Sequence, residues 1–191
     1  MNRQIWILLC ILISSCQASK EEKMISPFDN CDDFVYPTST YTSKGLAFKM
    51  SMPADYEIIT EDEDLQIIAS KPTEQDYYLE SFGVNASYNT LNLPLDEIFN
   101  SAIEADQLAY ENSTDITNFK LLGKGSILVN DYDLKWILQT YKEEGEPDLS
   151  LLDFYHASED IAYKFTFGAY SSNMDSLICK YEKIISTIEF L

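Results

Sequence analysis

Residues 161–170 read IAYKFTFGAY, and this stretch decides the fold because its polar and apolar side chains alternate. Phe165 and Phe167 fall on one side, and Lys164 and Thr166 fall on the other. Successive side chains of a β-strand point to opposite faces, so a period of two predicts a strand with one buried face. We therefore expect this segment to be one member of a half-buried sheet.

The same alternation recurs at other places along the chain. We expect further strands at residues 46–52, 56–60, 65–70, 82–88, 119–129, 134–141 and 149–156. Trp136 and Tyr163 fall on the side that is predicted to form the core. Turn-forming residues at 130–131 and 144–147 separate neighbouring strands.

Two segments change to the helical period. Residues 94–111 carry an apolar stripe made of Leu95, Ile98, Phe99, Ala102, Ala105, Leu108 and Ala109. A last helix is expected to be capped by Ser172 or Asn173. Its buried side consists of Met174, Leu177, Ile178, Tyr181 and Ile185. The order of strands, helix, strands and helix predicts an α+β domain in which helices pack on an antiparallel sheet.

The N-terminus has the pattern of an export signal. Arg3 precedes an apolar run at residues 5–13 that is too short for a stable transmembrane span. Ser14 and Ser15 lead into Cys16, which resembles the lipobox of bacterial lipoproteins, where the cysteine is lipidated and becomes the new N-terminus. An ordinary secretory signal with a chance cysteine and an uncleaved anchor helix are the alternatives, and both still imply export.

This signal divides the chain into three predicted parts. Residues 1–15 are the signal peptide, residues 16–44 are a lipidated tether and lead, and residues 45–191 are a single globular domain. We expect the protein in the bacterial cell envelope, anchored in the membrane through lipid at Cys16, on its periplasmic or its surface side.

The charge balance is strongly acidic. The chain has 13 basic and 32 acidic residues and a formal net charge of −19. This charge excludes nucleic acid as a partner and argues against docking on anionic headgroups, so membrane attachment should depend on the acyl chains. Solubility explains the acidity, and a role in binding cations or a basic partner is the alternative.

Two cysteines, Cys31 and Cys179, remain in the folded part of the exported chain. Two cysteines in an exported domain suggest one disulfide. Two separate buried thiols are the alternative. A disulfide here would connect the N-terminal lead with the C-terminal helix.

Several local strings together resemble the PsbP-like fold, which includes the DcrB-type bacterial lipoproteins. The strings are residues 48–53, 95–98, 162–166 and 184–190. Tyr56 stands where the family usually has tryptophan, and residues 130–132 replace a more usual glycine turn. The resemblance implies an α/β/α sandwich and a non-catalytic accessory or assembly protein.

The sequence offers little material for a catalytic or metal site. His156 is the only histidine, and it lies in a predicted strand outside any known motif. One histidine and two distant cysteines are too few ligands for zinc. Acidic turns at 61–64, 131–133 and 143–148 offer the oxygen ligands that calcium prefers. None of them has the calcium-loop pattern. We expect no metal, no cofactor and no catalytic residues.

The polar side of the predicted sheet is the candidate binding face. Its residues are Lys49, Ile137, Gln139, Tyr141, Lys164, Thr166 and Tyr170. Amphipathic tyrosines on a mixed surface suit contacts with proteins. The alternative is that residues 34–41 or another element cover this face.

These observations favour a non-enzymatic binding or assembly accessory in the envelope, with an envelope protein as its partner. Two alternatives remain at this point. One is an immunity or inhibitor lipoprotein that blocks a basic toxin with its acidic surface. The other is an envelope hydrolase whose site assembles from scattered carboxylates.

Overall fold

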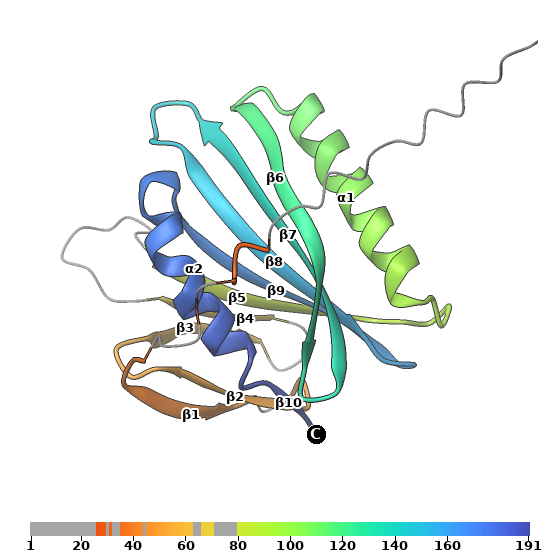
Figure 1. Ribbon diagram of the computed structural model, residues 1–191. Helices are drawn as coiled ribbons and strands as arrows, with labels where there is room; N and C mark the ends of the chain where they lie inside the picture. The colour runs from red at the N-terminus through yellow and green to blue at the C-terminus, as the bar shows by residue number, and fades with distance from the viewer. Residues whose placement is uncertain (1–25, 30, 32–34, 44, 63–65, 71–79) are drawn as a thin grey trace, which may run out of the picture.

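A large antiparallel sheet organises the fold in this computed structural model, which describes residues 26–29, 31, 35–43, 45–62, 66–70 and 80–191 (Figure 1). The sheet has seven strands in the described part of the chain. Their spatial order is β3 (Glu57–Asp62), β4 (Gln66–Ser70), β5 (Glu80–Tyr88), β9 (Ile161–Tyr170), β8 (Leu149–Ala157), β7 (Tyr132–Glu143) and β6 (Ile116–Val129). The strands predicted from alternation are therefore present, and neighbouring strands pair antiparallel.

A second, smaller sheet consists of β1 (Thr38–Thr42), β2 (Phe48–Pro53) and β10 (Glu189–Phe190). β2 is the central strand and pairs antiparallel with both neighbours. β1 falls within residues 16–44, which the sequence assigned to the tether and lead. The first described strand thus begins before residue 45.

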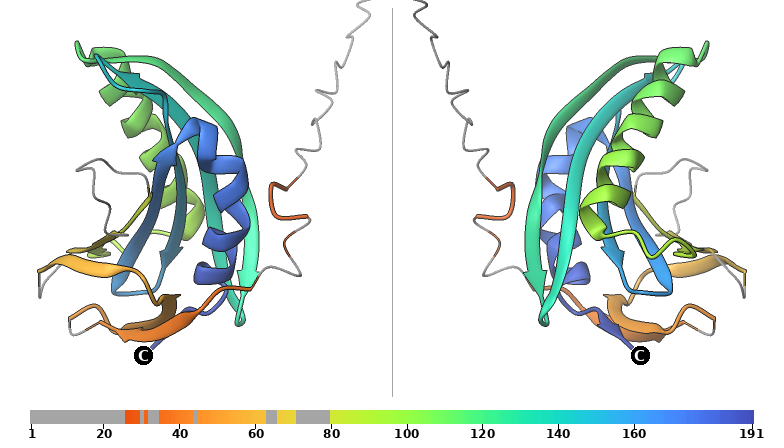
Figure 2. Two further views of the ribbon diagram at one scale, coloured as in Figure 1. Left: turned by 90° about the vertical axis from the view of Figure 1, so that its left-hand side faces the viewer. Right: turned by 90° about the vertical axis from the view of Figure 1, so that its right-hand side faces the viewer.

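Two helices lie on opposite sides of the large sheet (Figure 2). α1 (Leu95–Asn112) packs on one face, and α2 (Ser171–Ile185) packs on the other together with the small sheet. This arrangement confirms the predicted α+β class, with helices packed on antiparallel sheets.

The main core lies between the large sheet, α2 and the small sheet. Trp136, Tyr163, Phe165 and Phe167 are all buried there, as their alternation predicted. Phe48 of β2 is fully buried and meets Phe165 edge to face, with ring centroids 5.6 Å apart. Full burial of one such side chain contributes about 2–3 kcal/mol.

Both helices differ in detail from the sequence prediction. In α1, Ala105, Leu108 and Ala109 are exposed, although the predicted stripe included them. The last turns of α1 instead place Asp106 and Tyr110 toward the sheet. α2 begins at Ser171, and Tyr170 occupies its N-cap position without a side-chain cap hydrogen bond, so capping by Ser172 or Asn173 is wrong.

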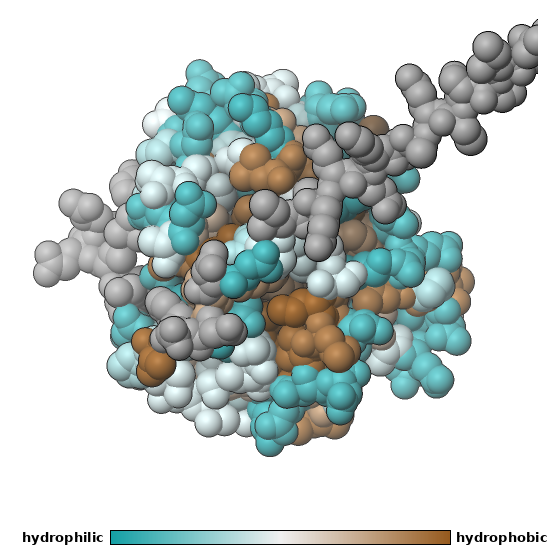
Figure 3. Space-filling view, viewed as in Figure 1, coloured by the Kyte–Doolittle hydropathy of each residue, from teal (hydrophilic) through white to brown (hydrophobic). Residues whose placement is uncertain are grey.

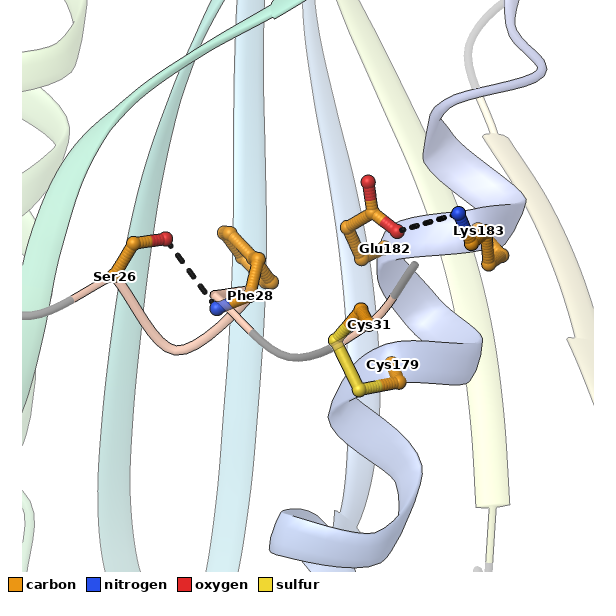
Figure 4. Close-up of a disulfide and its surroundings, with 6 residues drawn as sticks. All are labelled: Ser26, Phe28, Cys31, Cys179, Glu182 and Lys183. Carbon is orange, nitrogen blue, oxygen red and sulfur yellow. Dashed lines mark hydrogen bonds and ion pairs between the residues drawn. A yellow bond between two sulfur atoms is a disulfide. The ribbon is translucent and has the colours of Figure 1, made fainter. Parts of the chain in front are cut away.

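A disulfide joins the N-terminal lead to α2 (Figure 4). Cys31 and Cys179 have Cα atoms 4.9 Å apart and close a sequence separation of 148 residues. Just before it, Phe28 packs against Trp136 and Phe154, with ring centroids 5.5 Å and 5.8 Å apart. The described part of the lead therefore lies on the α2 side of the large sheet.

The surface on the α2 side mixes polar regions with several separate apolar patches (Figure 3). None of the helices in the described residues is long and apolar enough to cross a membrane. The predicted signal peptide at 1–15, Cys16, and tether residues 17–25 lie outside the described residues.

Candidate functional site

Six of the predicted binding-face residues share one face of the large sheet, and the strand register shows this directly. Ile137 pairs with Asp153, and Asp153 pairs with Thr166 across β7, β8 and β9. The neighbouring sets of paired residues on the same face contain the other four predicted residues, Gln139, Tyr141, Lys164 and Tyr170.

Lys49 is the exception. It lies on β2 in the small sheet, where its Nζ is 2.9 Å from a carboxylate oxygen of Glu189. Including Lys49 in the face was therefore wrong. Alternation tells which residues of one strand share a side, but it does not tell which sheet the strand joins.

α1 covers part of this face. Phe99 and Ile103 of α1 form a small apolar cluster with Ile137 and Tyr155 of the sheet. Ile137 and Gln139 are only 1% and 0% exposed, so neither belongs to an open surface. The covering element is α1, whereas the described residues of the expected cover, 35–41, lead into the small sheet, and Phe34 lies outside the described residues.

Beneath α1 a buried carboxylate meets a lysine. Asp153 of β8 is fully buried, and its Oδ2 atom lies 3.3 Å from the Nζ atom of Lys164. Lys164 also lies 3.5 Å from a carboxylate oxygen of Asp106, which comes from α1. The amide nitrogen of Gln139 donates a hydrogen bond to Asp153 Oδ2 at 3.2 Å. These ion pairs thus connect α1 to strands β8 and β9 of the large sheet.

Burial and charge shift the pKa values in this cluster. Desolvation raises the pKa of Asp153 above its usual value, and Lys164 only partly opposes this rise. Burial acts to lower the pKa of Lys164, but Asp153, Tyr155 and Asp106 outweigh it and hold that pKa above its usual value. Lys164 is therefore a stable cation held between two carboxylates.

Four residues of the site were not predicted from the sequence: Asp153, Asp106, Tyr110 and Tyr155. A signal for Asp153 was present, because it is the one charged residue in the mostly apolar segment 149–155. A charge at such a position is costly to bury without a partner. Lys164 lies on the polar side of β9, where the alternation of that strand placed it. The register needed to bring these two residues together is not visible in the sequence.

Beside the part that α1 covers, the same face holds a pocket of about 230 Å³. It is lined by Ser81 of β5, Tyr141 and Glu143 of β7, Leu149, Ser150 and Leu151 of β8, and Gly168 and Ala169 of β9. A Cβ atom placed on Gly168 would lie 2.8 Å from Ser81 Oγ, so the absence of a side chain there keeps the space next to Ser81 open.

Tyr141 is held at this pocket by other aromatic rings. Its ring centroid lies 5.3 Å from that of Tyr110 on α1, and Tyr110 stacks on Phe119 of β6 at 4.3 Å. Burial raises the pKa of Tyr141, and the carboxylates of Glu143 and Asp153 raise it further. The neutral phenol of Tyr141 is therefore favoured over its anion.

His156 lies elsewhere and makes packing contacts. Its ring stacks on Phe190 with centroids 4.2 Å apart, and its Nδ1 atom is 3.2 Å from the carbonyl oxygen of Asp133. Burial lowers the pKa of His156. Among the described residues, no three His, Cys, Asp or Glu side chains are grouped closely enough to hold a metal ion. Glu61 and Asp62, expected in a turn, are the last residues of β3.

The fold is PsbP-like, as comparison with solved structures shows. The cyanobacterial PsbP protein CyanoP from Synechocystis sp. PCC 6803 matches with a TM-score of 0.62 and 9% identity, over 84% of this chain and 96% of that one. LpqN of Mycobacterium tuberculosis, described as involved in cell envelope biogenesis, matches with a TM-score of 0.51 and 10% identity, over 80% and 84% of the two chains.

A protein from Bacteroides thetaiotaomicron VPI-5482 is also similar, with a TM-score of 0.53 and 18% identity, over 80% of this chain and 48% of that one. No family model and no curated protein matches the sequence. At these identities the similarity concerns the fold. The Cys31–Cys179 disulfide is a bond typical of oxidising, extracytoplasmic compartments.

Proposed function

We propose that the chain is a lipid-anchored binding module of the bacterial cell envelope, which contacts an envelope protein and carries out no catalysis. The observation that carries this proposal is the pocket at the open part of the predicted face, with Tyr141 on its wall and Gly168 where β9 crosses it. An aromatic side chain at the edge of a concave, partly apolar surface is typical of protein contact sites.

The contacts of the ionisable groups favour binding over catalysis. Lys164 is engaged by Asp153 and Asp106, and the ring of His156 stacks on Phe190. These groups are used in packing and in docking α1. LpqN, a protein of similar fold, is described as involved in cell envelope biogenesis, which agrees with an envelope role. We propose no cofactor and no metal.

Anchoring through Cys16 is part of the proposal and has its own test. The full-length chain is expressed in a bacterium that is grown with radiolabelled palmitate, beside a Cys16→Ala variant. We expect label and membrane association for the unchanged chain and neither for the variant. Label that persists in Cys16→Ala would contradict the assigned anchor.

The binding role is tested by cross-linking in native membranes and affinity capture of the full-length protein. We compare the unchanged chain with Tyr141→Ala, Tyr170→Ala and a control, Tyr88→Ala. Tyr88 is 71% exposed and lies at the far end of β5 from Ser81, so it serves as a matched surface tyrosine.

We expect one captured protein that disappears with Tyr141→Ala, weakens with Tyr170→Ala and remains with Tyr88→Ala. Truncating a tyrosine at the centre of a contact site commonly costs at least about 2 kcal/mol, or roughly thirtyfold in affinity. A partner that is captured equally by all of these variants would exclude this face as the binding surface.

A further inference from the structure

We propose that the pocket between Tyr141 and Ser81 receives an arginine side chain of the partner protein. This inference rests on the proposed function, because it names the chemistry that the same surface recognises. It commits to a basic protein as the partner.

The size of the pocket favours a single side chain. Its volume is about 230 Å³, whereas sites for cofactors and other small molecules usually measure about 300–1,000 Å³. The pocket opens at the sheet face between β5 and β7, where it can accept a side chain that protrudes from another protein.

The lining fits the two halves of an arginine. Leu149 and Leu151 provide apolar surface for the methylene stem, and Tyr141 provides an aromatic ring for the planar guanidinium. Glu143 provides the carboxylate with which a guanidinium pairs. Of the described residues that line the pocket, none is basic.

The local charge points in the same direction. Burial raises the pKa of Tyr141, and Glu143, which also lines the pocket, raises it further, so an acidic side chain lies close to the aromatic wall. A neighbouring hollow on the other side of Glu143 is lined by Asp115 and Glu144 among others. A basic partner would meet acidic groups both in the pocket and next to it.

The net charge of −19 extends this complementarity to the whole molecule. A strongly acidic protein attracts a basic partner over long range, and the association rate then falls as salt is added. The opposite choice, an acidic partner, would be repelled during approach and would place a carboxylate beside Glu143.

The test uses the full-length protein in detergent micelles and small probes observed by NMR. The first probe is Nα-acetyl-arginine amide, and the second is Nα-acetyl-citrulline amide, which has nearly the same shape without the charge. The reporters are the backbone amide signals of Ser81 and Gly168. The variant is Glu143→Gln, and the matched control is Glu144→Gln, which removes an acid next to the pocket but outside its lining.

We expect the arginine probe to shift both reporters in a saturable way at millimolar concentration. Binding should weaken about fivefold in Glu143→Gln, the scale of one partly exposed ion pair, and stay unchanged in Glu144→Gln. The citrulline probe should leave the reporters in place. Equal binding of both probes, or an arginine response that Glu143→Gln leaves intact, would overturn the proposal.

A neutral sugar, N-acetylglucosamine, serves as a third probe. A shift of the reporter signals caused by this sugar in place of arginine would also overturn the arginine proposal.

The capture experiment separates this inference from the proposed function. If a partner is lost with Tyr141→Ala while the arginine probe does not bind, the binding surface stands and the arginine assignment falls. If neither the partner nor the probe depends on Tyr141, both are wrong.

Discussion

Replacing Lys164 by methionine should strongly destabilise the fold, because it removes the cation that Asp153 faces in the buried cluster under α1. Asp153 is fully buried, whereas the side chain of Lys164 is 30% exposed. Removing one partner of a buried ion pair typically costs 3–5 kcal/mol, and the partial exposure of Lys164 puts the expected loss near the lower end, at about 3 kcal/mol. The unfolding midpoint should then fall by about 6–12 °C.

The cost should depend on which partner is removed. Asp153→Asn leaves Lys164 partly solvated and still close to Asp106, and an asparagine oxygen can still accept the hydrogen bond from Gln139. We therefore expect Asp153→Asn to cost only about 1 kcal/mol. The double variant Lys164→Met/Asp153→Asn should be clearly more stable than Lys164→Met alone, because it contains no uncompensated buried charge.

The effect should also vary with pH. The pKa of Asp153 is raised in the folded protein, so the neutral acid is favoured there relative to the unfolded chain. The stability that comes from this preference is complete below about pH 4 and is lost as pH rises through the folded-state pKa. Without Lys164 this pKa should rise further, so the loss in Lys164→Met should be smaller at pH 4.5 than at pH 7.

Urea unfolding followed by circular dichroism at both pH values measures all three variants. Equal losses of stability in Lys164→Met and Asp153→Asn would contradict the unequal roles of the two residues. A double variant less stable than Lys164→Met, or a loss that does not shrink at lower pH, would contradict a buried charge on Asp153 as the cause.

Further measurements test other parts of the structure. Reducing the Cys31–Cys179 bond should lower the free energy of unfolding by up to about 5 kcal/mol, the entropic limit for so long a loop, and thermal unfolding with and without dithiothreitol measures this. Gly125→Ala should destabilise the folded protein by about 1–3 kcal/mol, because the added Cβ would lie 2.9 Å from the indole of Trp136. Urea unfolding followed by tryptophan fluorescence measures this, and an unchanged midpoint would contradict it. Burial lowers the pKa of His156 below its unfolded value, so the free energy of unfolding should fall as pH drops below about 6.5. Urea unfolding between about pH 5 and 7.5 should show a weaker fall in His156→Gln.

Local patterns predicted most of the fold because they report directly on burial within one element. Alternation placed Phe165 and Phe167 in the core, and both are fully buried. The helical period located α1, but it misassigned the C-terminal half of that helix. Leu108 is 58% exposed, whereas Tyr110 in the same half of the helix stacks on Phe119, so the inner side of this half differs from the predicted stripe.

The candidate site could be predicted only in part, because it depends on which strands become neighbours. The shared side of Tyr141 and Lys164 followed from alternation, and the register agrees with it. The placement of Lys49 in a separate sheet depends on its long-range pairing with Glu189. Asp106 is sequence-distant from Asp153, and only the packing of α1 on the sheet brings both of them to Lys164.

The disulfide also determines how the molecule responds to mechanical force. Because the bond closes a loop over a separation of 148 residues, tension applied between the two chain ends passes from Cys31 directly into α2 at Cys179. β1, β2 and the β3–β9 strands lie inside this closed loop and cannot be stretched end to end while the bond is intact, whereas β10 (Glu189–Phe190) follows Cys179 and lies outside it. Only the chain before Cys31 and the chain after Cys179 can lengthen under tension, so a pull between the two ends would act on the packing of α2 and on the pairing of β10 with β2, and would leave the pocket beside Tyr141 in its folded shape.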